Sequence, residues 1–157
     1  MDLVSKLDAI EGIKLAKARY FRAVDSKDAK LLQSVLADDV VCDYRGATTD
    51  PITGYNLAPD TTNEPIRGGA YVAESIVQAM MEMRSVHHAS LPEIEITGPT
   101  SGNAIWPMVD RLLFAEGAPF KELIGYGHYY ESYKREGGDW KISSIRLVRS
   151  RLDFIPW

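Results

Sequence analysis

Residues 84–96, RSVHHASLPEIEI, contain two adjacent histidines followed by an alternating apolar run that ends at Ile94 and Ile96. A β-strand sends neighbouring side chains to opposite faces of its sheet. If this segment is a strand, one of His87 and His88 points into whatever the sheet covers, and the other points away. We interpret the inward histidine as a general base in a closed apolar pocket.

The alternating pattern continues to the end of the chain, whereas the part before it has helical periodicity. Turns are expected at Gly98-Pro99, Glu116-Gly117 and Gly137-Gly138. The pattern predicts helices over 3–26, 28–36 and 68–83, a first strand over 40–45, and long strands over 86–96, 103–114, 120–135 and 140–153. Helices followed by an antiparallel meander indicate an α+β fold, a curved sheet around helices. Residues 1–157 are expected to form one domain.

The segment 46–67 breaks this regular pattern, with three prolines and several Thr, Asp and Asn residues. A loop of this length in a compact domain is usually functional or disordered. We interpret it as a lid or pocket rim, with a disordered segment as the alternative.

Composition excludes several classes of function. The net charge of −4 without a long basic run argues against nucleic-acid and anionic-membrane partners. No apolar stretch is long enough to span a bilayer, and the acidic start does not resemble a secretory signal, so a cytoplasmic location is expected. The single cysteine, Cys42, excludes an intrachain disulfide and a Cys-based metal site, and three histidines offer no metal-ligand spacing. Neither GxSxG nor a phosphate-binding Gly-rich loop is present.

Three polar residues occupy positions where the pattern predicts apolar ones. Asp110 shares its strand face with Trp106 and Leu112, Arg149 shares one with Leu147, and Asp25 follows Phe21 by one helical turn. A buried charge is unfavourable unless it is paired, so each of the three should have a partner. Buried salt bridges or positions at element ends explain these residues as well as a chemical role does.

A His–Asp pair is a plausible acid–base unit, because the carboxylate fixes the imidazole tautomer and raises the basicity of the other ring nitrogen. The chain is also rich in tyrosine, and a phenol in an apolar pocket can donate to a substrate carbonyl as negative charge develops there. His88 and His128 fit surface or core positions better than catalysis. The tyrosines are Tyr20, Tyr44, Tyr126, Tyr129 and Tyr130, some of which must simply pack.

Four sequence segments together resemble a known family. They are ARYFRAVDSKDAKLLQSVLADDVV, the histidine before PEIEI, AIWPMVDRLLF, and GYGHYYESYKREGGDWKISSIRLVR. The chain is similar to the SnoaL-like group of the nuclear transport factor 2 superfamily, and nearest to its bile-acid 7α-dehydratase and scytalone dehydratase branch. The resemblance covers nearly the whole chain and implies a cone-shaped α+β barrel with three N-terminal helices in a mainly antiparallel sheet.

The resemblance also implies roles for individual residues. The catalytic histidine falls on His87, its aspartate partner on Asp25, and a catalytic tyrosine on Tyr20. The residues assigned to substrate binding are Tyr44, Asp110, Arg149, Trp106, Tyr126 and His128. Two departures from the pattern stand out: the segment 48–65 is longer than in the bile-acid branch, and Pro107 interrupts the strand before Asp110, which could displace that acid.

We therefore expect a lyase that needs no cofactor and no metal. His87, oriented by Asp25, would remove a proton from carbon, and water would leave from a bulky, apolar, steroid-like or polycyclic substrate. Asp110 could protonate the leaving hydroxyl and Arg149 could anchor the pocket. Isomerisation or polyketide-type cyclisation in the same pocket is an alternative. So is a noncatalytic ligand-binding or assembly domain, which would show a filled or shallow cone and an Asp25–His87 distance too long for a hydrogen bond. The resemblance implies a homo-oligomer, a trimer or a dimer through the outer sheet face.

Overall fold

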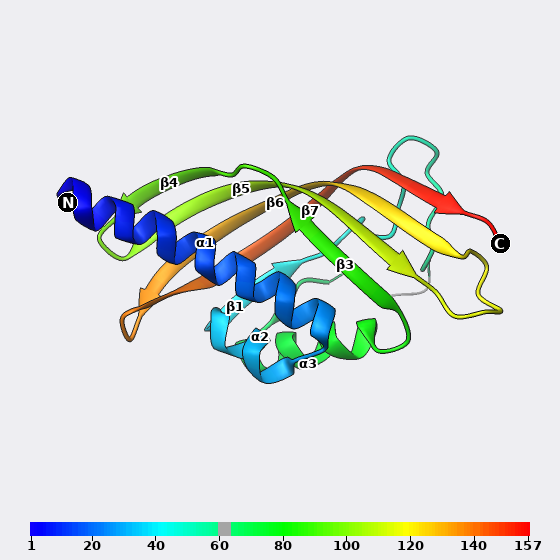
Figure 1. Ribbon diagram of the computed structural model, residues 1–157, viewed down its shortest axis with the longest axis horizontal. Helices are drawn as coiled ribbons and strands as arrows, with labels where there is room; N and C mark the ends of the chain where they lie inside the picture. The colour runs from blue at the N-terminus through cyan, green and yellow to red at the C-terminus, as the bar shows by residue number, and fades with distance from the viewer. Residues whose placement is uncertain (60–63) are drawn as a thin grey trace.

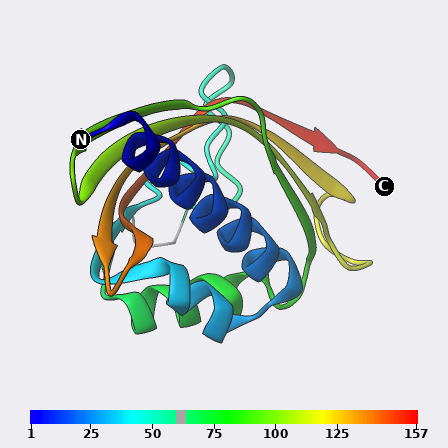
Figure 2. The same ribbon diagram turned by 60° about the vertical axis from the view of Figure 1, so that its left-hand side comes forward.

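The computed structural model describes residues 1–59 and 64–157, in which a curved sheet wraps around one long helix (Figures 1 and 2). Two short helices lie below the long one, on the open side of the sheet (Figure 2). The helices are α1 (Leu3–Ser26), α2 (Ala29–Val35) and α3 (Gly69–Met80). The strands are β1 (Leu36–Asp43), β2 (Ile66–Arg67), β3 (Arg84–Ala89), β4 (Glu93–Gly98), β5 (Ser101–Leu113), β6 (Glu122–Glu136) and β7 (Asp139–Ile155).

The seven strands follow the order β2-β1-β7-β6-β5-β3, and β4 also pairs with β5. All pairs are antiparallel except β1 with β7, which run parallel. The predicted α+β class with three helices against a mainly antiparallel sheet is confirmed. The cone-shaped sheet is not closed, because within the described residues β2 and β3 end the sheet without pairing with each other. The result is an open cone with α1 packed against its inner face.

The strand predicted over 86–96 is two strands, β3 and β4, which pair with successive parts of β5. The break at Ser90 to Pro92 coincides with Pro107 on β5, whose carbonyl accepts from the Ser90 N–H. The proline nitrogen faces the same side as its carbonyl, where β3 has ended, so its missing N–H is not needed for the ladder. β5 therefore continues through Pro107, and Asp110 is not displaced.

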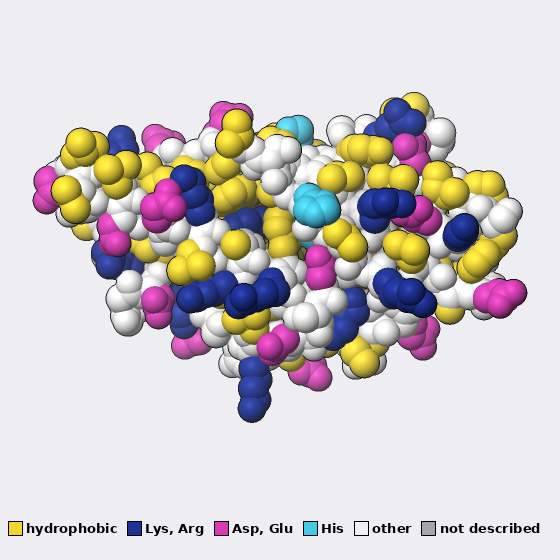
Figure 3. Space-filling model, in the orientation of Figure 1, with side chains coloured by type: hydrophobic (Ala, Val, Ile, Leu, Met, Phe, Trp, Pro, Cys, Tyr) yellow, Lys and Arg dark blue, Asp and Glu magenta, His cyan; other side chains and the backbone are white. Residues whose placement is uncertain are grey.

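The inner face of α1 packs into the core of the cone. Its buried residues recur at three- and four-residue steps and include Ile13, Tyr20 and Phe21. Asp2 caps the start of the helix by accepting from the Ser5 N–H. The first two turns of α1 are exposed, and their apolar side chains gather at the left of Figure 3. No helix in the described part of the chain has the length and apolar character needed to cross a membrane.

The described part of the expected lid packs on β7. The buried Asp50 carboxylate accepts hydrogen bonds from the Leu152 N–H at 3.1 Å and from Thr53. Hydrogen bonds from Thr53 outweigh the effect of burial and lower the pKa of Asp50 to about 2. Residues 60–63 of the expected lid lie outside the described residues. The contact between Asp50 and Leu152 holds this part of the segment against the sheet, and its role as a lid or pocket rim stays a prediction.

Candidate active site

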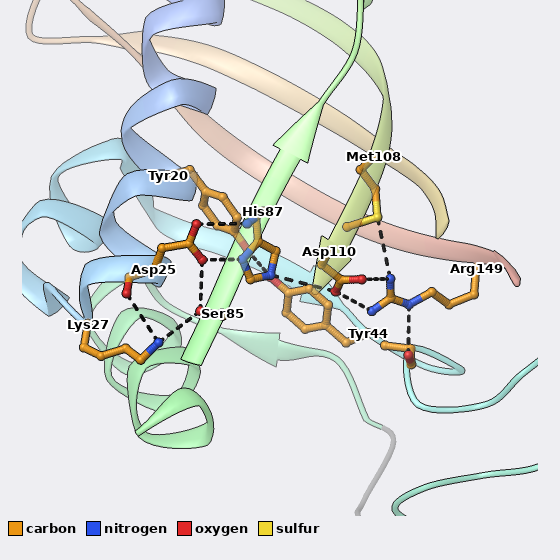
Figure 4. Close-up of polar contacts among 10 residues, drawn as sticks. Tyr20, Asp25, Lys27, Tyr44, Ser85, His87, Met108, Asp110 and Arg149 are labelled. Carbon is orange, nitrogen blue, oxygen red and sulfur yellow. Dashed lines mark hydrogen bonds and ion pairs between the residues drawn. The ribbon is translucent and has the colours of Figure 1, made fainter. Parts of the chain in front are cut away.

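The last turn of α1 and the middle of β3 bring Asp25 and His87 together. His87 Nδ1 lies 2.6 Å from Asp25 Oδ1, and the His87 backbone N–H donates to Oδ2 at 2.9 Å. The Ser85 hydroxyl, two residues earlier on the same strand face, donates to Oδ1 at 2.9 Å. Of the two adjacent histidines, His87 is the buried one, with 5% of its side chain exposed, and His88 points outward. Figure 4 shows these contacts.

The environment of Asp25 keeps this carboxylate ionised. Burial raises its pKa, but hydrogen bonds from the side chain and backbone of His87 and from Ser85 outweigh burial, so the pKa is lowered overall. An ionised carboxylate only accepts hydrogen bonds, so Nδ1 must carry the proton that points at it. In the neutral ring, Nε2 is then the unprotonated nitrogen and can act as a base.

Nε2 faces Asp110, which stands directly opposite His87 in the β3–β5 ladder. The distance from Nε2 to Asp110 Oδ2 is 3.9 Å, beyond hydrogen-bond length. Arg149 on β7 holds both oxygens of Asp110 at 2.8 Å and also donates to the carbonyl of Ala47 at 3.0 Å. Asp110 and Arg149, each of which was expected to have a partner of opposite charge, therefore pair with each other. Figure 4 shows the imidazole between Asp25 and Asp110.

Gly125 on β6 leaves the space that the Asp110–Arg149 pair occupies. It lies opposite Asp110 in the β5–β6 ladder and opposite Leu152 in the β6–β7 ladder. A Cβ at this position would overlap Asp110 Oδ1 and Arg149 Nη1. A side chain here would force the ion pair to move, so the glycine is part of the site although it carries no chemistry.

Tyr20 on α1 and Tyr44, just after β1, meet through their hydroxyls at 2.7 Å. Burial raises the pKa of both phenols well above the ordinary value, so both keep their protons. One hydroxyl donates to the other, and the second keeps a proton for another acceptor. Tyr44 also contacts the buried Cys42 thiol, which is one acceptor for this remaining proton.

Aromatic side chains enclose the imidazole. The ring of Phe21 stacks on His87 with centroids 5.8 Å apart and planes 16° apart, and Tyr129 on β6 packs against Phe21. Phe21, Ser85 and Gly125 were not assigned to the site from the sequence. Ser85 could have been predicted, because it shares the strand face of His87. Gly125 could have been predicted in the same way, because it shares the face of Tyr129 on β6.

Three of the residues expected in the pocket lie apart from this group. Tyr126 and His128 are exposed on the outer face of β6, opposite to Tyr129. Trp106 is buried in the core, where its Nε1 donates to the Tyr133 hydroxyl at 3.0 Å. Because strand neighbours alternate in direction, Tyr126 and His128 cannot face the same side of the sheet as Tyr129.

A second buried ionic cluster lies inside the cone, and it was not predicted from the sequence. Lys17 on α1 is 1% exposed, and its Nζ lies 2.5 Å from Glu131 on β6. Tyr133 donates to the other Glu131 oxygen. The Lys17 ammonium lies 3.6 Å from the centroid of the Tyr129 ring and 4.4 Å from that of Phe21. Its position between Ile13 and Tyr20 on the apolar helix face was the available signal.

Within residues 1–59 and 64–157, no group of three or more His, Cys, Asp and Glu side chains is arranged to hold a metal ion. Cys42 is buried, and burial raises the pKa of its thiol to about 12, so it is a packing residue in this environment.

Comparisons with known proteins agree with this architecture. Residues 5–146 match the SnoaL-like domain family, so the chain belongs to that family. A putative scytalone dehydratase from Novosphingobium aromaticivorans has a similar structure, with a TM-score of 0.77 at 16% identity over 99% of this chain and 97% of that one. A hexachlorocyclohexane dehydrochlorinase, LinA-type3 from Novosphingobium barchaimii, has a TM-score of 0.74 at 16% identity over 98% and 94%. A protein from Mycobacterium tuberculosis, described as of unknown function, has a TM-score of 0.73 at 19% sequence identity, over 95% of this chain and 76% of that one.

Proposed function

We propose that this protein is a cofactor-independent lyase that removes water from an apolar carbonyl compound. One observation carries the proposal: the 2.6 Å contact between Asp25 and His87 Nδ1, which leaves Nε2 as a base among aromatic side chains. The dehydratase and the dehydrochlorinase of the same fold are both named for eliminations, which supports this class of reaction.

The reaction would proceed in two steps. His87 Nε2 takes a proton from the carbon next to the substrate carbonyl, and the electrons of the C–H bond move to the carbonyl oxygen. The remaining proton of the Tyr20–Tyr44 pair stabilises this enolate. The electrons then return to form a carbon–carbon double bond as the β-hydroxyl leaves. No electrons pass to or from the protein, so the chemistry is complete without a cofactor.

Proton delivery to the leaving hydroxyl falls to the imidazolium formed in the first step. Asp110, our expected donor, accepts two hydrogen bonds from Arg149, which is the arrangement of an ionised carboxylate. We therefore assign Asp110 to stabilising the charged imidazole from 3.9 Å, and Arg149 to holding Asp110 and the Ala47 carbonyl. The proton removed from carbon leaves with the hydroxyl as water.

The substrate we propose is bulky and apolar, steroid-like or polycyclic. Phe21, Tyr129 and Met108 supply apolar surface close to His87 and the Asp110–Arg149 pair. Our proposal assigns the imidazole and the Tyr20–Tyr44 pair to the polar groups of the substrate, which suits a molecule with one carbonyl and one leaving group. An extensively hydroxylated or charged substrate would leave its polar groups unpaired here.

The test is a screen of hydroxylated steroids and polycyclic β-hydroxy ketones for loss of water, followed by mass spectrometry. His87→Gln should lower the rate by roughly 10²–10⁴-fold, the usual contribution of a general base. His88→Gln, which changes the exposed neighbour, is the matched control and should leave the rate unchanged. Equal activity of the wild type and His87→Gln would refute the assignment.

Isomerisation and cyclisation need the same proton abstraction without a leaving group. The screen therefore includes incubation in D₂O, where an isomerase would exchange a substrate proton for deuterium without losing water. The noncatalytic alternative predicted a filled or shallow cone and an Asp25–His87 distance too long for a hydrogen bond. On the second point, the two side chains are in hydrogen-bond contact. That contact favours a catalytic site over an assembly domain.

We also propose that copies of the chain associate through the outer face of the sheet, as a trimer or a dimer. Val86, Tyr126, Tyr130 and Val148 supply exposed apolar surface there. Light scattering with size-exclusion chromatography should give a multiple of the chain mass. Val148→Glu should shift the population to monomers, and a monomeric wild type would overturn the proposal.

A further inference from the structure

Lys27, the residue that ends α1, has a backbone conformation that favours glycine. Its φ of 60° makes it the one non-glycine residue with positive φ among residues 1–59 and 64–157. Helices commonly end with a residue in this left-handed region, and glycine adopts it without steric cost. A lysine at this position is less favourable than a glycine. We therefore ask whether the contacts of the Lys27 side chain compensate for the unfavourable backbone.

The lysine side chain turns back toward the candidate site. Its Nζ donates to Ser85 Oγ at 3.0 Å and, at 3.4 Å, to the backbone carbonyl of Asp25 (Figure 4). An ammonium group can only donate hydrogen bonds. Ser85 Oγ therefore accepts from Lys27, and the single proton of the hydroxyl points at Asp25 Oδ1, 2.9 Å away.

This fixed direction continues to the imidazole. Asp25 Oδ1 accepts from the Ser85 hydroxyl and from His87 Nδ1, and Oδ2 accepts from the His87 backbone N–H. With three donors in place, the carboxylate cannot rotate without losing one of them. The proton of the imidazole is thereby held on Nδ1.

We propose that Lys27 and Ser85 are positioning residues that hold His87 in the tautomer with a bare Nε2. This inference rests on the proposed role of His87 as the base. Without the ammonium, the Ser85 hydroxyl is free to rotate away from Asp25. The carboxylate then loses one of its three donors and is freer to rotate, so the hydrogen bond that holds the imidazole proton on Nδ1 is weakened.

A purely structural role for Lys27 makes a different prediction. If Lys27 only ends the helix, Lys27→Gly should improve the left-handed position and leave His87 unchanged. If Lys27 positions Ser85, Lys27→Gly and Lys27→Met should disturb His87 equally, although only the glycine variant relieves the backbone. Stability and histidine chemistry therefore separate the two roles.

The experiment is NMR of the full-length protein with ¹⁵N-labelled histidine, which distinguishes the protonated ring nitrogen from the bare one. His88 and His128 are exposed and serve as internal references. The variants are Lys27→Met, Lys27→Gly, Ser85→Ala and Lys27→Arg, which retains a donor. Lys30→Met changes an exposed lysine of α2 and is the matched control.

In the wild type, His87 should show a protonated Nδ1 whose proton exchanges slowly with solvent. Lys27→Met, Lys27→Gly and Ser85→Ala should speed this exchange about tenfold or more, as the loss of one charge-assisted hydrogen bond implies. Lys27→Arg and Lys30→Met should behave like the wild type. Thermal unfolding should show Lys27→Gly at least as stable as the wild type, which excludes misfolding as the cause.

Two results would overturn the inference, and they differ in what else they affect. Unchanged exchange at His87 in Lys27→Gly and Ser85→Ala removes Lys27 and Ser85 from the site and leaves His87 as a candidate base. A wild-type His87 with its proton on Nε2 contradicts both this inference and the proposed function.

Discussion

Two buried ionic clusters occupy the same cone, and they differ in whether their polar atoms all have hydrogen-bond partners. In the cluster around Lys17, the ammonium, both oxygens of Glu131 and the Tyr133 hydroxyl bind one another beneath aromatic rings. In the cluster around His87, Nε2 stands 3.9 Å from Asp110 without a hydrogen bond in the described part of the chain. A cluster whose polar atoms satisfy one another supports structure, whereas one with an unpaired base can perform chemistry.

The largest expected effect follows from changing the carboxylate that orients the base. Asp25→Asn keeps the shape of the side chain but lets its amide donate to Nδ1, which moves the imidazole proton to Nε2 and removes the base. Activity should fall by roughly 10²–10⁴-fold. The ¹⁵N shifts of His87 report the tautomer directly, and retention of a bare Nε2 in this variant would contradict the role of Asp25.

Breaking the Lys17 cluster should affect stability rather than catalysis. Lys17→Met leaves Glu131 buried without its cation and should lower the free energy of unfolding by about 3–5 kcal/mol, measured by urea denaturation. The double variant Lys17→Met, Glu131→Gln removes both charges and should recover most of that loss. If the single variant unfolds like the wild type, the cluster is not the structural pair that its contacts indicate.

Gly125→Ala tests the space behind the site. The added methyl group overlaps the Asp110–Arg149 pair, and forcing it to move should cost about 1–3 kcal/mol of stability. The activity should fall further than stability implies, because the shift reaches Asp110 opposite His87. Unfolding and turnover measured on the same sample separate the two effects. Gly117→Ala, in a turn outside the site, meets no atom of the described residues within 4 Å but has a φ of 96°, so it should lower stability through backbone strain without the additional loss of activity.

The smallest effect is a difference in pH dependence between the clusters. The pKa of Asp25 is lowered in the folded protein, so its contribution to stability is present above about pH 4 and is lost as the pH falls through the folded value. Burial lowers the pKa of Lys17, so the unfolded chain binds more protons in the window below 10.5 and stability rises with pH there. Asp25→Asn should flatten the acid side of the stability curve, and Lys17→Met the alkaline side.

Much of the candidate site could be predicted from positions where polar residues interrupt an apolar pattern. That reasoning identified Asp110, Arg149 and Asp25, and alternation along the strand required one inward histidine. It failed for Tyr126 and His128, because their chemistry was considered without the direction of Tyr129 next to them on β6. It also did not predict the role of Lys17, because a lysine on a helix is usually exposed and only the structure shows that this one is buried.

The sequence by itself determined the α+β class, the order of the helices and long strands, and the inward direction of His87, Asp110 and Arg149. Periodicities of 3.6 and 2 residues are local properties, and they do not depend on distant partners. Only the tertiary structure decided which inward charges meet: Asp110 with Arg149, Lys17 with Glu131, and Ser85 with Asp25 and Lys27. These contacts join residues up to 114 positions apart, as for Lys17 and Glu131, through strand registers and a helix position that no local pattern encodes.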